Sequence, residues 1–277
     1  MAEAGGAMKS MKLYDKVERI YNELHARGID DDSPLDVEDL TPFDQYHYHG
    51  TAAVDAAVAS LGIGPETRVL EVGAGIGGPA RYLAAATGCR VTALEIQPDL
   101  DEVGASLTAR CGLQDRVAHV CGDVLDGPLD GGGFDVLISY LVFLHIPDRA
   151  RLFATCRAAL RPGGRIFTED FTKRREPTAE DWAALEEKVL CPYLPSAEEY
   201  AAQLEAAGFA DLALEDMSRS WTAFTAERHA AFAAARPRHQ EIHGPEITAG
   251  LADFYGTVAG LYGRGVLGGL RFVATSP

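Results

Sequence analysis

Three carboxylates and a run of glycines have the spacing of a nucleoside-binding cleft. Glu71 comes two positions before the glycine-rich turn 73–78. Glu95 lies 20 positions after Gly75, and Asp123 follows the apolar run RVAHVCG. Glycines let the backbone turn tightly and approach a ligand, and a carboxylate at a strand end accepts hydrogen bonds from the two hydroxyls of a ribose. We therefore expect Glu95 at a ribose and Asp123 at an adenine amino group.

The charge of these side chains narrows the choice of ligand. A glycine turn alone suits NAD as well as other nucleoside ligands. Three carboxylates around one cleft, however, disfavour a pyrophosphate and favour a cationic ligand. The pattern therefore favours S-adenosylmethionine, whose sulfonium is a cation, over NAD.

Four stretches of the chain carry a family resemblance. LEVGAGIGGPARYLA, TALEI, GDV and LRPGGRIFTEDF resemble the motifs of the class I S-adenosylmethionine-dependent methyltransferases, across residues 65–172. The resemblance implies that Gly73 and Gly75 lie beside the methionine part of the cofactor. It also implies that Glu71 orders the glycine loop or reaches the amino group of the cofactor. The expected cofactor-binding residues are Glu71, Gly73, Gly75, Glu95, Ile96, Gln97, Asp123, Val124 and Tyr140.

A histidine beyond the fourth expected strand is the candidate general base. His145 follows the apolar run FDVLISYLVFL, which we expect to form that strand. An unperturbed imidazole titrates close to neutrality, as a proton acceptor in methyl transfer should. The alternative is a histidine that only caps or hydrogen-bonds the next helix. The segment 43–50 gathers polar and aromatic side chains, and we expect it to cover the cofactor and to place Tyr46 beside His145.

These segments are similar to small-molecule N-methyltransferases of the phosphoethanolamine and sarcosine/dimethylglycine type. In that group a histidine after the fourth strand works with a tyrosine from the N-terminal region, which implies catalytic roles for His145 and Tyr46. The alternatives to Tyr46 are Tyr14, Tyr21 and Tyr48. Leu141 stands where the phosphoethanolamine enzymes carry an acid, so the sequence does not favour a phosphobase substrate.

Aromatic side chains near the same edge are expected to wall the acceptor site. Rings of this kind hold an ammonium or methylated cation at roughly 0.5–2 kcal/mol per ring. Core packing is the alternative for each of them. Arg264, ahead of the last strand, is a candidate for binding a substrate carboxylate. The expected substrate residues are Tyr48, Phe143, Phe171, Tyr193, Trp221 and Arg264.

The elements that must position these residues alternate between strand and helix. Residues 67–170 pass from short apolar and β-branched runs to helical stretches and back, which predicts right-handed crossovers and a parallel sheet. The resemblance implies an α/β, Rossmann-like sheet of seven strands, mostly parallel, with an antiparallel last strand at GGLRFVATS. We expect an N-terminal helical lid over 1–60 and a methyltransferase domain over 61–277. Helical cover insertions are expected near 172–195 and 219–263.

Composition removes several classes of partner. The chain has 277 residues and a formal net charge of −16, from 25 Lys+Arg and 41 Asp+Glu. Such an acidic surface repels phosphate backbones and anionic lipids, so neither nucleic acid nor a membrane is an expected partner. The five cysteines form no C-x-x-C pair, which favours reduced thiols, and no metal site is predicted. No signal-peptide pattern or membrane span is evident, so a cytoplasmic location is expected. The oligomeric state is left open.

These observations together favour an S-adenosylmethionine-dependent methyltransferase. The leading hypothesis is transfer to the nitrogen of a small polar amine, such as an amino acid or a betaine precursor. Transfer to oxygen, sulfur or carbon of a small metabolite is the alternative among methyltransferases. An NAD-dependent oxidoreductase and a non-catalytic binding module are the alternatives from other classes.

Overall fold

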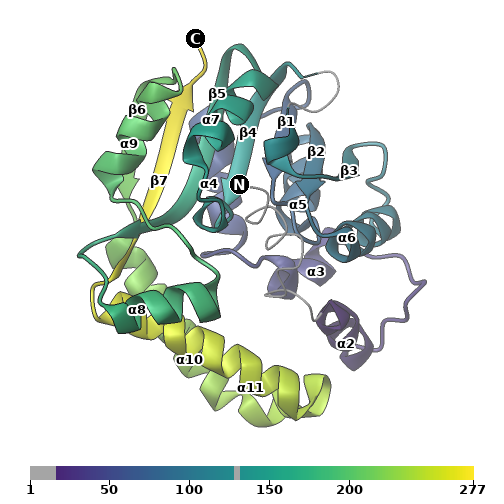
Figure 1. Ribbon diagram of the computed structural model, residues 1–277. Helices are drawn as coiled ribbons and strands as arrows, with labels where there is room; N and C mark the ends of the chain where they lie inside the picture. The colour runs from purple at the N-terminus through teal and green to yellow at the C-terminus, as the bar shows by residue number, and fades with distance from the viewer. Residues whose placement is uncertain (1–16, 128–131) are drawn as a thin grey trace.

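The fold is built on one seven-stranded mixed sheet. The computed structural model describes residues 17–127 and 132–277. Its strand order is β3-β2-β1-β4-β5-β7-β6 (Figure 1). The strands are β1 (Arg68–Val72), β2 (Arg90–Glu95), β3 (Val117–Cys121), β4 (Phe134–Tyr140), β5 (Leu160–Lys173), β6 (Ala210–Asp216) and β7 (Leu267–Thr275).

Strand directions confirm the predicted topology. β1 pairs in parallel with both β2 and β4, and the β2–β3 and β4–β5 pairs are also parallel. β7 runs antiparallel between β5 and β6. The strand order reverses between β1 and β4, and ligands of open α/β sheets bind at the carboxyl ends of strands at such a switch point.

Two layers of helices bury the two faces of the sheet. α4 and α5 pack on one face around Val69 and Phe167, and α7 and α9 pack on the other around Leu70 and Phe272. The α-helices are α2 (Glu18–Ala26), α3 (Val37–Asp44), α4 (Thr51–Leu61), α5 (Gly78–Thr87), α6 (Pro98–Arg110), α7 (Arg149–Ala159), α8 (Ala179–Ala184), α9 (Ala197–Ala206), α10 (Ser218–Ala234) and α11 (Arg236–Gly263). Shorter turns are η1 (Val124–Asp126), η2 (Phe143–His145) and η3 (Leu185–Val189).

Capping residues start the helices that were expected after β5. Thr178 accepts from the N–H of Asp181 at the start of α8, and Ser196 accepts from the N–H of Glu199 at the start of α9. In each case the side chain of the acid accepts from the backbone N–H of the capping residue, which completes a capping box. The chain leaves α9 through Gly208, at φ 88°. Both helices therefore begin at a residue whose side chain satisfies a backbone N–H of the first turn.

The apolar run 134–144 is only partly a strand, contrary to the expectation. β4 ends at Tyr140, Leu141 has a φ of 54°, and Phe143–His145 forms the short turn η2. The N–H of Leu141 still bonds to the carbonyl of Glu169, so the chain turns away directly after the sheet. The residues after Tyr140 are apolar because they line cavities and the core, and not because they continue a strand.

The C-terminal cover contains a kinked helix. The segment expected to be a helical cover near 219–263 forms two helices, α10 from Ser218 and α11 from Arg236. Gly244, at φ 81° and ψ 166°, breaks α11 just before Pro245. The Gly-Pro pair therefore marks a kink between two helical halves and not the end of a loop.

The helices outside the two layers gather at one end of the sheet. Figure 1 shows α2, α3, α8, α10 and α11 beyond the end at which the parallel strands finish. Within the described residues, none of the helices has the length and apolar character needed to cross a bilayer. None of the five cysteines, all of which are described, forms a disulfide.

Candidate active site

One cleft at the switch point brings all nine expected cofactor-binding residues together. It opens where β1, β2, β3 and β4 end, and the N-terminal residues Asp44, Tyr46 and His47 close it from the other side. The nine residues in its lining are Glu71, Gly73, Gly75, Glu95, Ile96, Gln97, Asp123, Val124 and Tyr140. We call this space the cofactor cleft.

The glycine turn has a backbone that other residues adopt poorly. Gly73 and Gly75 have φ values of 74° and 55°. A Cβ at Gly73 would lie 2.3 Å from a methyl group of Val142, so a side chain there would displace the segment after β4. The left-handed conformation and the close approach of Val142 both explain why the sequence has glycine at this position.

Glu95 connects the glycine turn to the end of β2. Its carboxylate accepts from the N–H of Gly75 at 2.8 Å and from the N–H of Gln97 at 2.9 Å. The side chain is buried, and burial raises its pKa despite these two donors. A carboxylate has about four acceptor sites. The N–H of Ile96 is a third donor to this carboxylate, and its remaining acceptor capacity is available to the ribose hydroxyls that the sequence predicted.

Two buried polar atoms in the cleft have no partner among the described residues. They are Oε2 of Glu71 and the hydroxyl of Tyr140. Burial raises the pKa of Glu71 to about 8, although the guanidinium of Arg81 opposes the shift. Buried polar groups are rarely left unsatisfied. A ligand that brings hydrogen-bond donors and positive charge would satisfy both atoms.

Acidic side chains predominate among the ionisable groups of the cofactor cleft. Glu71, Glu95 and Asp123 line it, and no Lys or Arg appears in the described part of its lining. A fourth acid, Asp44, is neutralised by Arg81 at 3.0 Å, and both side chains are fully buried. Asp123 accepts from the N–H of Leu125 and so also begins η1. The cleft therefore suits a cationic ligand, as its sequence predicted.

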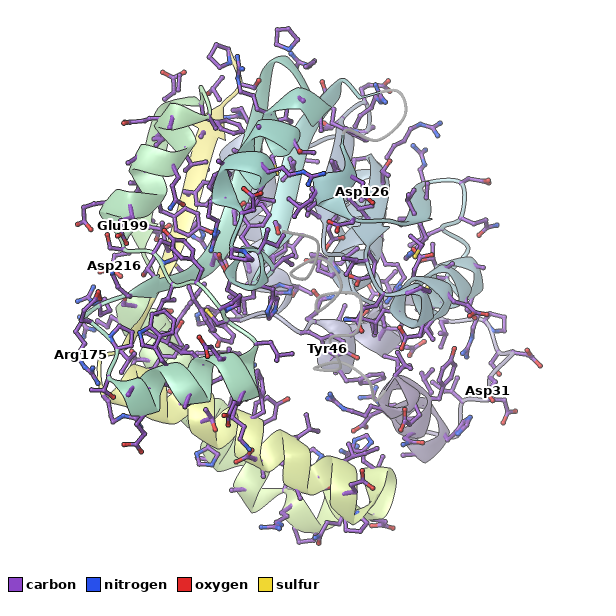
Figure 2. All side chains as sticks on the ribbon, viewed as in Figure 1. Asp31, Tyr46, Asp126, Arg175, Glu199 and Asp216 are labelled. Carbon is purple, nitrogen blue, oxygen red and sulfur yellow. The ribbon has the colours of Figure 1, made fainter. Side chains whose placement is uncertain are left out.

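A second, larger cavity adjoins the cleft. It encloses about 800 Å³ between the N-terminal segment, the end of β5, and helices α10 and α11. Four residues line both spaces: Tyr46, His47, Leu141 and His145. Figure 2 shows Tyr46 between the end of the sheet and the C-terminal helices. We call the larger space the acceptor cavity and the four shared residues the junction.

His145 at the junction is held in one tautomer. Its Nδ1 lies 2.7 Å from the carbonyl oxygen of Leu190, which can only accept. The proton is therefore on Nδ1, and Nε2 keeps the lone pair. Burial lowers the pKa of His145 to about 4. The expected pKa near neutrality is wrong, because the ring is removed from water and no carboxylate of residues 17–127 or 132–277 contacts it to stabilise the imidazolium.

A buried polar network supports the turn that carries His145. The N–H of Leu144 donates to Asp170 of β5 at 3.2 Å. The hydroxyl of Tyr200 donates to the other oxygen of Asp170 at 2.5 Å, and Arg149 donates to that hydroxyl at 2.8 Å. All three side chains are buried. The network fixes η2 against the end of β5.

The structure distinguishes among the N-terminal tyrosines. Tyr46 lines both spaces at the junction, and burial raises its pKa. Tyr48 lines only the acceptor cavity, and Tyr21 lines neither space. Tyr14 lies outside the described residues. Tyr46 thus shares the junction with His145, and its catalytic role stays a prediction.

The aromatic rings expected to hold an ammonium have a cation of the protein against them. The guanidinium of Arg228 lies 4.5 Å from the ring centre of Tyr255, 4.9 Å from that of Tyr48 and 5.3 Å from that of Phe224. Nε of Arg228 is buried and has no hydrogen-bond partner among the described residues. The wall of the acceptor cavity therefore carries a positive charge of the protein at the rings that were expected to bind a cationic substrate.

Tyr48 and Phe171 line the acceptor cavity as expected, but four other predicted substrate residues do not. Phe143 is fully buried against Phe153, because the turn η2 directs it into the core. Trp221 is fully buried, and a Cβ on Gly269 of β7 would lie 2.3 Å from its ring. The expectation that these two rings wall the site is corrected.

The other two predicted substrate residues make contacts away from both spaces. Tyr193 accepts from the side chain of Gln203 at 2.7 Å, and Arg149 lies against its ring. Arg264 is exposed and pairs with Asp181 at 3.0 Å. A structural contact between α8 and the end of α11 accounts for Arg264, so its predicted role on a substrate carboxylate is also corrected.

Sequence reasoning missed several residues of the acceptor cavity. Arg228 was missed because two of its three rings, Tyr48 and Tyr255, come from distant segments of the chain. Three further residues of the cavity lining are Glu23, His239 and His243. Of these, His243 lies within hydrogen-bonding distance of Glu23. The sequence signal that could have identified this group is the spacing of His239 and His243, because residues four apart lie on one face of a helix.

Comparison with known proteins agrees with this architecture. Residues 70–168 match a family model described as a methyltransferase domain. A glycine/sarcosine/dimethylglycine N-methyltransferase of Actinopolyspora halophila is 29% identical over 178 residues, which cover 64% of this chain and 32% of that protein. A 27-O-demethylrifamycin SV methyltransferase of Amycolatopsis mediterranei is 28% identical over 245 residues, which cover 85% of this chain and 86% of that protein.

A solved structure shares the fold. It is phosphoethanolamine N-methyltransferase 2 of Haemonchus contortus, in complex with phosphomonomethylethanolamine and S-adenosylhomocysteine. The TM-score is 0.79 at 19% identity, and the match covers 96% of this chain and 60% of that one. The chain thus spans less than two thirds of this structure and of the Actinopolyspora relative. The predicted resemblance to these N-methyltransferases is confirmed, and residues 70–168 are similar to a methyltransferase domain.

Proposed function

We propose that this chain, built around a methyltransferase domain, is an S-adenosylmethionine-dependent methyltransferase of an organic small molecule. One observation carries the proposal: an acidic nucleoside cleft opens into a large second cavity through the junction formed by Tyr46, His47, Leu141 and His145. Methyl transfer requires a donor and an acceptor aligned across a short, water-poor gap, and the junction provides such a place.

The residues of the cleft fit this cofactor. Glu95 would hold the ribose hydroxyls and Asp123 the adenine amino group, while Glu71 and Tyr140 offer the polar atoms that lack partners in the described structure. The absence of Lys and Arg from the described lining supports a cation over a pyrophosphate. When bound, S-adenosylmethionine supplies an activated methyl group on its sulfonium sulfur.

The hydrogen bonding of His145 supports a role for this residue as the group that accepts a hydrogen bond from the nucleophile. The contact with Leu190 leaves Nε2 with its lone pair, so the ring can accept the proton of an acceptor hydroxyl or amine as the methyl group is transferred. The low pKa keeps the ring neutral, and thus able to accept, across the physiological range. Tyr46 and Leu141 limit the access of water to the same point.

The acceptor cavity favours an acceptor larger than an amino acid. Its volume of about 800 Å³ lies in the range of sites for drug-sized ligands. Arg228 places a guanidinium against three rings of its wall. The relative matched over most of both chains is named for a 27-O-demethylrifamycin SV substrate. We infer transfer to a hydroxyl or amino group of a ring-containing molecule.

A small polar amine is the second candidate, and the names of other relatives favour it. The Actinopolyspora protein is named for glycine, sarcosine and dimethylglycine. That match covers 64% of this chain, and a shared cofactor domain contributes to such a match whatever the acceptor. Arg228 against the rings disfavours a second cation at the same position.

Calorimetry tests the proposed cofactor, and a substrate panel tests the proposed class of acceptor. S-adenosylhomocysteine should bind and NAD should not; the reverse result would overturn the cofactor assignment. Formation of S-adenosylhomocysteine is then followed with glycine, sarcosine and phosphoethanolamine, and with hydroxylated aromatic and macrocyclic compounds. Turnover of the second group supports the large acceptor. Turnover confined to the small amines would contradict it and support the second candidate.

A further inference from the structure

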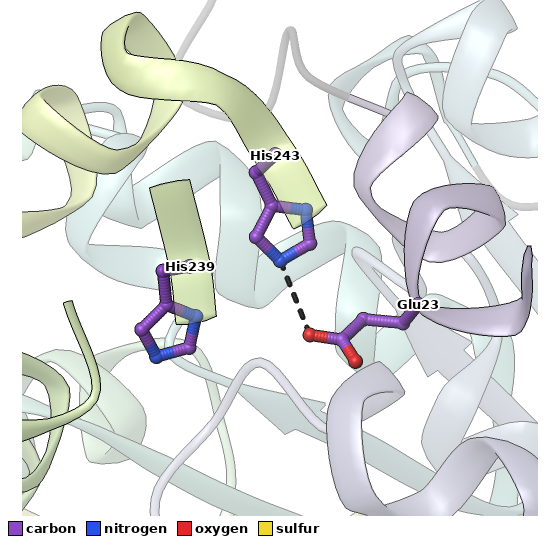
Figure 3. A group of neighbouring side chains, drawn as sticks. All are labelled: Glu23, His239 and His243. Atoms are coloured by element: carbon purple, nitrogen blue, oxygen red, sulfur yellow. Dashed lines mark hydrogen bonds and ion pairs between the residues drawn. The ribbon is translucent and has the colours of Figure 1, made fainter. Parts of the chain in front are cut away.

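Three potential metal ligands meet on the wall of the acceptor cavity. They are Glu23 from α2 and His239 and His243 from α11, and Figure 3 shows the three side chains converging between the two helices. Their ligand atoms all lie within 4.8 Å of one another. Nε2 of His243 is 3.1 Å from Oε1 of Glu23. We call these three residues the Glu23–His239–His243 cluster.

The local structure explains why the two histidines face the same way. They are four residues apart in the first half of α11, ahead of the break at Gly244, and so lie on one face of the helix. Their rings are nearly parallel, at 15° with centres 6.0 Å apart. Phe232 stacks on the other side of His239, with ring centres 4.2 Å apart. The stacking fixes both rings toward α2.

The chemistry of the cluster suits a divalent transition metal. Glu23 and His243 are buried and His239 is half-buried. Nδ1 of each histidine is buried and has no hydrogen-bond partner among the described residues. A neutral imidazole has one ring nitrogen with a lone pair that can bind a metal. Two imidazoles and a carboxylate are a ligand set that proteins use for zinc.

Arg238 orients the carboxylate and also limits the affinity of the site. It donates to both oxygens of Glu23, at 3.1 and 2.8 Å. Ligating carboxylates are commonly held by such partners, and each oxygen has a second lone pair for a metal. The guanidinium charge opposes a bound cation, so the affinity should be moderate.

We propose that Glu23, His239 and His243 bind one divalent transition-metal ion, with Zn²⁺ as the best-suited species. Three protein ligands leave at least one coordination position open, as in catalytic zinc sites. Because all three side chains line the acceptor cavity, an oxygen or nitrogen of the acceptor can reach that position. The ion would then orient the acceptor within the cavity, a role that rests on the proposed function.

Metal titration tests the proposal without relying on methyl transfer. Chelator-treated full-length protein is titrated with Zn²⁺ by calorimetry, and with Co²⁺ while the visible absorption of that ion is recorded. One equivalent should bind, and His239→Ala and His243→Ala should each weaken binding by at least about 10-fold. His25→Ala is the matched control, since His25 is on α2 and lies 2.7 Å from Asp31 but is exposed. It should leave metal binding unchanged.

Several results would overturn the metal site, and none depends on the proposed enzyme activity. Absence of saturable binding, or equal affinity in both histidine variants, would do so. A thiolate-to-cobalt band would place the metal on cysteine instead. Glu23→Gln provides the last comparison. If it lowers the melting temperature equally with and without Zn²⁺, the cluster only joins α2 to α11. S-adenosylhomocysteine binding by each variant checks that it has folded.

Discussion

The cofactor cleft and the acceptor cavity share a junction, but they are assembled in different ways. The cleft is formed by the ends of neighbouring parallel strands, and hydrogen bonds such as that from Gly75 to Glu95 fix its polar groups. The cavity depends on helices brought together from both ends of the chain, so that Glu23 contacts a residue 220 positions later. Local geometry thus determines the cofactor, and long-range packing determines the acceptor.

The cofactor cleft and the acceptor cavity also differ in the charged side chains that line them. Within the described residues, carboxylates line the cleft without Lys or Arg, whereas five Lys or Arg side chains and four acids line the cavity. The lining of the cofactor cleft favours a cationic ligand. The acceptor cavity offers charges of both signs among aromatic walls, which allows acceptors of varied chemistry. Variants on each side should therefore separate binding of the cofactor from turnover of the acceptor.

The largest expected effect is at the junction. His145→Ala should lower the rate of methyl transfer by about 10²–10⁴-fold, the usual contribution of a general base. The affinity for S-adenosylhomocysteine should change little, because Glu95 and the glycine turn remain. Rates at saturating cofactor and calorimetry measure the two quantities. A parallel loss of cofactor affinity would break the separation of the two regions, and an unchanged rate would remove His145 from the mechanism.

Removal of a buried ion pair should have the next largest effect. Arg81 donates to the carbonyl of Ile76 in the glycine turn and pairs with Asp44 of α3. Arg81→Met leaves a buried carboxylate unpaired and should lower the free energy of unfolding by about 3–5 kcal/mol. Urea denaturation measures this change.

The matched control for that prediction is an exposed pair. Arg161 and Asp135 form an ion pair at 2.5 Å, and the side chain of Arg161 is 51% exposed. Arg161→Met should cost about 0–1 kcal/mol. The double variant Arg81→Met with Asp44→Leu should recover much of the first loss, because no charge then stays buried alone. Equal losses for Arg81→Met and Arg161→Met would contradict the argument.

A smaller effect is expected inside the cleft. Glu95→Gln keeps the shape of the side chain but loses charge-assisted hydrogen bonds, each worth about 1.5–3 kcal/mol. The affinity for S-adenosylhomocysteine should fall by roughly 10- to 100-fold in calorimetry. Asp99→Asn, an exposed acid at the start of α6, is the control and should bind normally. Normal binding by Glu95→Gln would disprove the ribose assignment.

The last predicted effect, no larger than that of Glu95→Gln, is a pH dependence of cofactor binding. The carboxyl of Glu71 has a pKa of about 8 in the empty protein, so it carries a proton at pH 7. A cationic cofactor favours the ionised carboxylate, and binding must then release that proton. Affinity for S-adenosylmethionine should therefore rise by up to about tenfold per pH unit from pH 6 to 8 and then level off.

Proton release can be measured directly. Calorimetry at pH 7 in two buffers of different ionisation enthalpy should give different apparent heats for the wild type. Glu71→Gln should remove both this difference and the pH dependence. A wild-type affinity that does not change between pH 6 and 8 would place the cofactor's charge away from Glu71.

The sequence predicted the sheet and the cofactor cleft because their signals are local. Each cleft residue sits at the end of a recognisable apolar run or within the glycine turn, and parallel strands bring such ends to one edge. Even so, the predicted strand was longer than the observed β4, because Leu141 is apolar whether it continues a strand or turns toward a cavity.

The acceptor side was less predictable because its residues depend on helix rotation and distant partners. Phe143 and Phe171 both follow apolar runs, yet the turn η2 buries the first while the second lines the cavity. Trp221 packs on a glycine of β7, a contact that no short-range pattern encodes. The spacing of His239 and His243 was visible, but their partner Glu23 is far away in the sequence.

The antiparallel pairing of β6 with β7 has an evolutionary consequence. The two strands are neighbours in the sheet, and the chain between them forms α10 and α11. In topology this excursion is one long hairpin connection. Doubling the length of such a connection costs only about 0.6 kcal/mol in closure entropy. Lineages can therefore lengthen or exchange the two helices while the strand register stays the same, so that this side of the acceptor cavity can change without altering the cofactor-binding sheet.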